Sequence, residues 1–311
     1  MVIDVHYHFM VSVNETVAKR MVASFIMPTA KKLGMTPDPE ALVKTVLETW
    51  ADPTGEFLIK SMDEGGIDVT VAVTTDNFDN KMLTREDVEK SVKLLSEVSG
   101  RNPGRIFPLA GLDPRRPEAA DMAKRFFEEY GIKGIKYHPD NGYDPSGRES
   151  YKVLEVLAEH KGVLLTHTSP LMPPSRNHLA EPMLLSAIGV DFPQIKVIAA
   201  HMNGYVNWRP WASLAAMQPR LYGDLAMWDN LAYTHYDVFC RELRTMIDLI
   251  GPNKILFGSD APIDTLLHPI RHWVQQIRNL TEKAPAGIRF TQEEVDAILG
   301  GNASRVLGLN K

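Results

Sequence analysis

The sequence predicts a (β/α)8 barrel, and three observations predict it. Eight apolar or β-branched runs recur along the chain, most are followed by an amphipathic stretch, and 311 residues suit one barrel. Strands that are apolar on both faces and alternate with helices are typical of a parallel sheet. We therefore expect a single α/β domain that spans residues 1–311.

The strand candidates follow one another at intervals along the chain. They are residues 2–9, 69–75, 106–113, 134–138, 162–168, 196–202, 221–227 and 255–260. The first of them, VIDVHYHF, alternates with a period of two. This period predicts that Asp4, His6 and His8 share one face of the strand.

Helices are predicted between the strands from apolar spacing and from residues that favour helix ends. In residues 116–131, Pro117 suits the first turn of a helix. In residues 291–301, Thr291 and Glu294 have the spacing of a capping box. Strands and helices therefore alternate along most of the chain.

Residues 10–66 do not fit a simple strand–helix unit. They separate the first two strands and contain several helical patterns, such as PEALVKTVLETW. So long a connection indicates a helical insertion over the barrel mouth rather than a loop. Two roles are open for it: a lid, or part of a subunit interface, in which case the chain forms a homo-oligomer.

Composition excludes several classes of protein. The net charge is −5 with no block of like charges, which argues against nucleic acid and anionic membranes as partners. No apolar run is as long as a membrane span, and no basic region followed by an apolar core opens the sequence. The single cysteine, Cys240, cannot form an intrachain disulfide. We expect a soluble, cytoplasmic protein.

Histidines gather where the predicted strands end. His6 and His8 end the first strand, His167 the fifth and His201 the sixth, while Asp260 ends the eighth. Catalytic groups of such barrels lie at the carboxyl ends of the strands. One of these histidines alone would suit a hydrogen-bonded core position, but their shared rim favours a functional site. Three imidazoles and a carboxylate suit a divalent cation such as Zn2+, and His201 is placed to accept a proton.

Seven motifs then reveal a resemblance that covers nearly the whole chain. They are DVHYH (4–8), GIKGIKYHP (131–139), LLTHT (164–168), VIAAHMNG (197–204), LYGDLA (221–226), LFGSDAP (256–262) and GNASRVLGL (301–309). With these motifs, in this order, the chain resembles the amidohydrolase superfamily. The resemblance is to the amidohydrolase-related group, which includes aminocarboxymuconate-semialdehyde decarboxylase and γ-resorcylate decarboxylase.

The resemblance implies roles for individual residues. It implies that His6, His8, His167 and Asp260 bind one divalent ion: Zn2+ is expected, with Mn2+, Fe2+ and Co2+ as alternatives. It also implies that His201 activates water or protonates the substrate. Asp260 keeps two roles, ligand and base.

Other polar residues at the predicted mouth are candidates for substrate binding. Lys136 stands where binuclear relatives carry a carbamylated lysine; we expect an unmodified lysine that binds a substrate carboxylate, with a surface lysine as the alternative. His138 faces the same way and is a candidate substrate contact. Arg176 and Arg209 suit a planar carboxylated substrate, and a subunit interface is equally open for them.

The expected function is metal-dependent hydrolysis of a small carboxylated substrate. A divalent ion lowers the pKa of its bound water toward neutrality, from about 16 to roughly 7, and His201 or Asp260 accepts the proton. Non-oxidative decarboxylation of an aromatic or unsaturated acid is the alternative on the same site, and hydration is a third. A non-catalytic ligand-binding barrel is disfavoured because structural zinc sites are usually closed and rich in sulphur.

Overall fold

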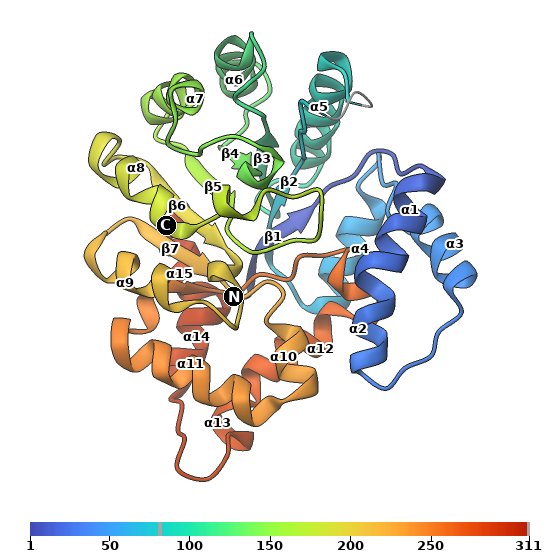
Figure 1. Cartoon of the computed structure of the whole chain (residues 1–311), viewed down its shortest axis with the longest axis vertical. Helices are drawn as coiled ribbons and strands as arrows, with labels where there is room; N and C mark the ends of the chain where they lie inside the picture. The colour runs from blue at the N-terminus through green and yellow to red at the C-terminus, as the bar shows by residue number, and fades with distance from the viewer. Residues whose placement is uncertain (80–82, 310–311) are drawn as a thin grey trace.

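The computed structural model describes residues 1–79 and 83–309. Within them, eight parallel strands hydrogen-bond in sequence order around a barrel, and helices surround the strands (Figure 1). The strands are β1 Ile3–His8, β2 Val69–Val73, β3 Ile106–Gly111, β4 Gly134–Tyr137, β5 Val163–His167, β6 Lys196–Ala200, β7 Leu221–Asp224 and β8 Ile255–Leu256. The predicted fold class is therefore confirmed.

Each strand lies inside its predicted range but ends earlier at the carboxyl side. The difference is largest at β8, where the range 255–260 contains a strand of only two residues. The chain then leaves extended geometry, and Asp260 has a left-handed backbone with φ of 55°. Ends of this kind give polar side chains room to point into the barrel mouth.

The helices outside the insertion follow the strands around the barrel. They are α5 Arg85–Arg101, α6 Ala119–Glu128, α7 Arg148–Glu159, α8 Ser186–Asp191, α9 Arg209–Met217, α10 Asp229–Thr234, α11 Tyr236–Ile250, α12 Ile270–Arg278, α13 Leu280–Lys283, α14 Gln292–Asp296 and α15 Asn302–Leu307. Shorter turns are η2 Pro139–Asn141, η3 Asn177–Leu179, η4 Pro182–Leu185, η5 His201–Asn203, η6 Pro252–Lys254, η7 Asp264–Leu266 and η8 Ala297–Gly301.

Two helix starts were predicted from end signals. The prediction for α14 is confirmed and that for α6 is wrong. Thr291 and Glu294 form the predicted capping box at the start of α14. Pro117 is not in the first turn of a helix, because α6 begins at Ala119 after the N-cap Glu118. The backbone N–H of Ala119 instead bonds the carbonyl of Arg116, so a turn precedes the helix.

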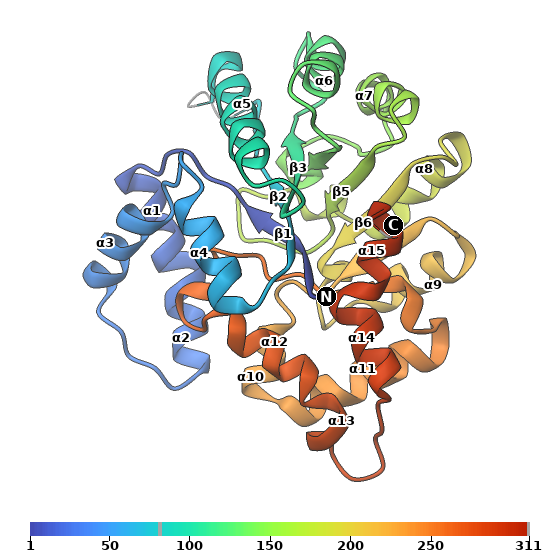
Figure 2. The same cartoon turned by 180° about the vertical axis from the view of Figure 1, so that it is seen from behind.

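Two apolar layers hold the barrel together. The inner layer includes Ile3, Val5, Val71 and Leu256 from the strands. The outer layer packs the opposite faces of the strands against the surrounding helices. Helix α15 contributes Val306 to the inner layer and crosses the end of the barrel where β1 begins (Figure 2). Apolar side chains therefore fill the inside of the barrel at this end.

The long connection between β1 and β2 is helical, as predicted. It contains α1 Glu15–Met21, η1 Val22–Ile26, α2 Met27–Lys32, α3 Pro39–Thr49 and α4 Glu56–Gly65. The first four pack on a small core of their own beside the barrel, to which Ile263 also contributes (Figure 1). Helix α4 differs, because Leu58 and Met62 join the outer barrel layer. It therefore serves as the helix of the first strand–helix unit.

None of the helices in residues 1–79 and 83–309 is both long enough and apolar enough to cross a bilayer.

Candidate active site

Histidine and aspartate side chains meet at the carboxyl ends of the strands. His6 and His8 lie on β1, His167 is the last residue of β5, His201 follows β6, and Asp260 follows β8. All five side chains are buried. Parallel strands that all end at one face of the barrel bring these residues together from distant parts of the sequence.

Three of the five side chains converge closely. Oδ1 of Asp260 lies 3.2 Å from Nε2 of His6 and 3.1 Å from Nε2 of His8. One donor atom of each of these three residues lies within 4.8 Å of the other two. Two imidazole nitrogens and one carboxylate oxygen are ligands that suit a divalent transition metal.

The protonation of His6 supports the same interpretation. Burial lowers the pKa of His6 well below its usual value, so the ring is neutral. Its Nδ1 donates to Oδ2 of Asp224 at 3.2 Å, which leaves a lone pair on Nε2. That lone pair faces a carboxylate oxygen of Asp260, and two acceptors so close together need a cation beside them. The donor set therefore fits a metal ion.

Lys136 supplies a positive charge at this point in the structure. Its Nζ lies 2.9 Å from Nε2 of His6, and the residue is only 1% exposed. Burial lowers the pKa of Lys136 to about 8, while the carboxylates of Asp260 and Asp224 act in the opposite direction. The alternative of a surface lysine at the rim is wrong.

Asp260 is ionised despite its burial. Burial alone would raise the pKa of this carboxyl, but the imidazoles of His6, His8 and His201 hold the pKa well below its usual range. The site therefore contains a fixed negative charge beside the imidazoles of His6 and His8. Such a charge attracts a cation.

His201 is oriented to exchange a proton through one nitrogen. Its Nδ1 lies 3.2 Å from the carbonyl oxygen of Ala226, so Nδ1 donates and Nε2 carries the lone pair. Burial lowers the pKa of His201 to about 4, with the carboxylate of Asp260 acting in the opposite direction. Its ring centroid is 5.1 Å from that of His6. A neutral base therefore lies beside the three converging side chains.

Asp224 is a site residue that the sequence reasoning did not single out. It ends β7, bonds His6 Nδ1, and accepts the backbone N–H groups of His201 and Ala226 at 2.8 and 3.1 Å. Its carboxylate thus connects His6 to His201. The available signal was an aspartate at the end of a predicted strand, in LYGDLA.

His167 and His138 form a second row next to the three converging side chains. Their rings stack with centroids 5.1 Å apart. Nε2 of His167 lies 2.7 Å from the carbonyl oxygen of Ser169, and Nδ1 of His138 lies 3.3 Å from Oδ1 of Asp140. Among the described residues, His167 is not in a group of three donors within 4.8 Å. Its predicted role as a ligand stays a prediction.

The two arginines predicted at the mouth lie in different surroundings. Arg209 begins α9, pairs with Glu242 at 3.4 Å and stacks on Trp208. Arg176 lines a cavity of about 420 Å3 together with Arg20 of the insertion and Asp140, the partner of His138. The structure does not bring Arg209 to the candidate site.

A further polar group lies near Asp260 and was also missed by the sequence reasoning. It consists of Asp229 and Tyr233 on α10 and His268, whose ring stacks on that of Tyr233 at 3.9 Å. Burial raises the pKa of Asp229 to about 7, and the nearby Asp260 carboxylate acts in the same direction. Within the described chain, Oδ1 of Asp229, Oη of Tyr233 and Nε2 of His268 are buried without a protein hydrogen-bond partner.

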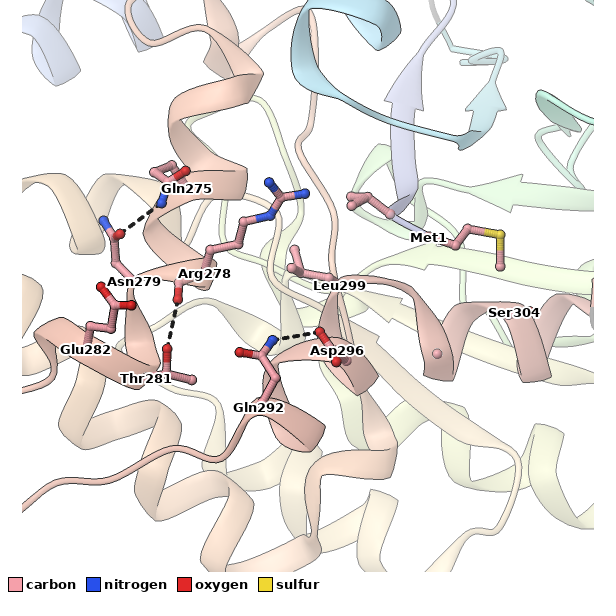
Figure 3. Close-up of a pocket in the computed structure, with 12 residues that line it drawn as sticks. Met1, Gln275, Arg278, Asn279, Thr281, Glu282, Gln292, Asp296, Leu299 and Ser304 are labelled. Carbon is pink, nitrogen blue, oxygen red and sulfur yellow. Dashed lines mark hydrogen bonds between the residues drawn. The ribbon is translucent and has the colours of Figure 1, made fainter.

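A larger cavity, of about 620 Å3, lies at the opposite end of the barrel (Figure 3). Met1, Arg278, Glu282 and Asp296 are among the residues that line it, beside the start of β1. The amino end of such a barrel contributes stability rather than catalysis. The histidines, and not this cavity, therefore mark the candidate active site.

Comparisons with known proteins agree with the barrel fold. A family model described as "Amidohydrolase" matches residues 3–309. No curated protein matches the chain. The chain is similar in structure to a dihydroxybenzoic acid decarboxylase from a Polaromonas species with bound manganese and 2-nitroresorcinol. The identity is 18%, the TM-score 0.68, and coverage 100% of this chain and 97% of that one.

Two other solved structures share the fold. One is 5-carboxyvanillate decarboxylase from Sphingomonas paucimobilis, with 16% identity, a TM-score of 0.65 and coverage of 99% and 98%. The other is 2,6-dihydroxybenzoate decarboxylase from Rhizobium, with 15% identity, a TM-score of 0.67 and coverage of 100% and 98%. At these identities the likeness shows a common fold.

Proposed function

Because the chain belongs to the amidohydrolase family, we propose that it is a metal-dependent decarboxylase of small aromatic or unsaturated carboxylic acids. It is an enzyme of the hydrolase or decarboxylase type. The three solved structures described above are named as decarboxylases of aromatic acids, which favours decarboxylation over the hydrolysis expected from sequence. Hydrolysis remains the second candidate, supported by the family description.

The observation that carries the proposal is the buried convergence of Asp260, His6 and His8. We propose that these residues hold one divalent ion and that His167 is a fourth ligand. Nε2 of His167 is engaged by the Ser169 carbonyl, which leaves Nδ1 as its ligand atom. When bound, the ion supplies positive charge that attracts and orients the anionic groups of a substrate. Manganese in one similar structure and the mixed ligand set support Mn2+ as well as Zn2+.

The proposed reaction replaces a carboxylate by a proton. The bond between the ring carbon and the carboxylate carbon breaks, its electron pair stays on the ring carbon, and carbon dioxide leaves. The ring carbon takes up a proton. We propose that Nε2 of His201 holds and delivers that proton, with the carboxylate of Asp260 as the second candidate base.

A carboxylated substrate fits the charges of the site. The Lys136 ammonium is buried beside His6, and a buried cation is stabilised by pairing with an anion. His138 lies next to His8, with ring centroids 6.1 Å apart, and its Nε2 is buried without a protein partner among the described residues. We propose that Lys136 and His138 contact the substrate. Arg176 is a candidate for an outer contact, whereas the pairing of Arg209 with Glu242 argues against that role.

The test is a substrate screen with Mn2+- and Zn2+-loaded protein. We expect 2,6-dihydroxybenzoate or 5-carboxyvanillate to release carbon dioxide and to yield the ring product without the carboxyl group. Lactones and amides of small acids should stay intact. Asp260→Asn is the matched inactive control. Hydrolysis of a lactone or amide without gas release from any of the acids would refute decarboxylation and establish the hydrolase.

A further inference from the structure

The barrel closes between its first and last strands through few backbone bonds. Strand β8 has two residues, and the segment after it completes the ring against β1. Three backbone bonds make this closure: Val5 N–H to Phe257, Asp260 N–H to His6, and His8 N–H to Ala261, at 3.0, 2.9 and 2.7 Å. Asp260 therefore lies at the closing seam, directly beside both histidines of β1.

A fully buried carboxylate, that of Asp4, spans this seam. Its Oδ1 accepts the backbone N–H of Ser259 at 3.0 Å, and its Oδ2 accepts the Ser259 hydroxyl at 2.6 Å. The same hydroxyl oxygen accepts the backbone N–H of Ala261 at 3.0 Å. Both neighbours of Asp260 in sequence are thus tied, directly or through one hydroxyl, to the Asp4 side chain.

Asp4 also acts on its own strand. Its Oδ1 accepts the backbone N–H of His6 at 3.0 Å. At this point Asp4 pairs with Thr70 and Tyr7 with Ala72, so β1 contains one extra residue relative to β2. An extra residue in a strand re-aims the side chains beside it. The Asp4 carboxylate therefore binds the backbone N–H of His6 within the irregular part of β1, which sets the direction of the His6 side chain.

Asp260 needs such support because its backbone is left-handed. A φ of 55° is unfavourable for a residue with a β-carbon and persists only when the surroundings enforce it. The bonds to Ser259 and Ala261 fix the chain on both sides of Asp260. This conformation is the one that carries Oδ1 of Asp260 to the Nε2 atoms of His6 and His8.

We propose that Asp4 is a positioning residue that, through Ser259, sets the geometry of the His6, His8 and Asp260 metal site. We call Asp4 and Ser259 together the seam clasp. The inference rests on the metal site in the proposed function and adds the group that assembles it. A site split between the first and last strands needs a fixed link between the two, and the seam clasp supplies that link.

The test compares Ser259→Ala with Thr74→Val, using the full-length chain freed of metal by a chelator. Thr74 is a matched control because its buried hydroxyl accepts the N–H of Gly111 and links β2 to β3, away from the seam. We measure the dissociation constant of Mn2+ by calorimetry, the visible spectrum of the Co2+ form, and the Tm of the metal-free protein. Asp4→Asn is a second variant that keeps the side-chain shape.

We expect Ser259→Ala and Asp4→Asn to weaken Mn2+ binding about tenfold or more and to change the Co2+ spectrum. Thr74→Val should bind Mn2+ within twofold of wild type, although its Tm should fall by about as much as that of Ser259→Ala. If Ser259→Ala binds Mn2+ as tightly as Thr74→Val does, the seam clasp has a structural role only and the inference is overturned. If the wild-type chain binds no Mn2+, Zn2+ or Co2+, the proposed metal site itself is overturned.

Discussion

Nζ of Lys136 lies 2.9 Å from Nε2 of His6, the same nitrogen that faces Oδ1 of Asp260 at 3.2 Å. One lone pair of His6 therefore serves either the ammonium of Lys136 or a bound metal ion. An ammonium and a divalent ion at this spacing repel each other. Because both are buried, water screens this repulsion only weakly. In the proposed metal site, Lys136 and the ion therefore compete for Nε2 of His6.

Replacing Lys136 by methionine should strengthen metal binding and weaken substrate binding. Without the ammonium, Mn2+ should bind about tenfold or more tightly at pH 7, because a repulsive charge is gone. KM for any carboxylated substrate should rise, because a buried cation no longer pairs with it. Calorimetry and steady-state kinetics measure the two effects. Loss of a second bound equivalent of metal in this variant would instead reveal a binuclear site with a carbamylated lysine.

Alanine substitution of the proposed ligands should abolish metal retention. We expect purified His6→Ala, His8→Ala and His167→Ala to retain less than about a tenth of the metal of wild type, since removing one ligand of three or four opens the site. Elemental analysis measures the retained metal. Arg209→Ala is the control, because its side chain is exposed and paired with Glu242. Full metal content in His167→Ala would leave a site of three protein ligands.

Asp224→Asn should weaken the metal site without removing a ligand. The Asp224 carboxylate accepts the proton on Nδ1 of His6 and so keeps the lone pair on Nε2. An amide can donate to Nδ1 and favour the wrong tautomer. Such a change behind a ligand typically costs about 10- to 100-fold in metal affinity. Unchanged Mn2+ affinity in a titration would show that the His6 ring is held by other contacts.

His201→Gln should keep the metal and lose catalysis. We expect kcat to fall by about 100-fold or more, because a positioned proton-transfer group contributes that much. Elemental analysis should show wild-type metal content, and a loss of metal would make His201 a ligand instead.

The stability of the metal-free protein tests the same residue through pH. Since the folded pKa of His201, about 4, lies below the unfolded value near 6.5, its contribution to stability is lost as pH falls through that window. His201→Gln should flatten this part of a plot of Tm against pH. An unchanged slope between pH 6.5 and 4 would contradict the assigned shift.

Asp229→Asn should stabilise the metal-free protein at high pH and not at low pH. The folded pKa of about 7 lies above the unfolded value near 3.9, so the unfavourable contribution grows as pH rises from 4 to 7. An amide cannot ionise and avoids this cost. Thermal unfolding at pH 8 and pH 4 should show a higher Tm for the variant at pH 8 only. An equal shift at both values would mean that charge is not the cause.

Periodicity and polarity were enough to predict the fold and the end of the barrel at which the candidate site residues gather. Alternating apolar runs placed all eight strands, and the barrel topology then required His6, His8, His201 and Asp260 to share one rim. The short β8 could not be foreseen, because its early end depends on the left-handed turn at Asp260. A single sequence gives no direct sign of such a turn.

The contacts of individual side chains were harder to predict than the end of the barrel at which they lie. Asp224 was missed because its role is to hold His6, and a contact between residues 218 positions apart leaves no local pattern. Arg209 was placed at the mouth because it follows β6 in sequence. The α9 helix instead directs it toward Glu242 of α11. Sequence spacing fixes the strand end but not where a loop residue points.

The closing seam has a consequence for when the proposed metal site can form during synthesis. His8 and Asp260 are 252 residues apart, so the nascent polypeptide carries both β1 histidines long before the ribosome has made their carboxylate partner. Ring closure must bridge almost the whole chain, and contacts of such large sequence separation form slowly. The complete set of proposed ligands therefore exists only after the ring has closed. In the proposed site, a metal ion binds most tightly to the closed ring and so stabilises that state. A rise in metal affinity during refolding would therefore report when the ring closes.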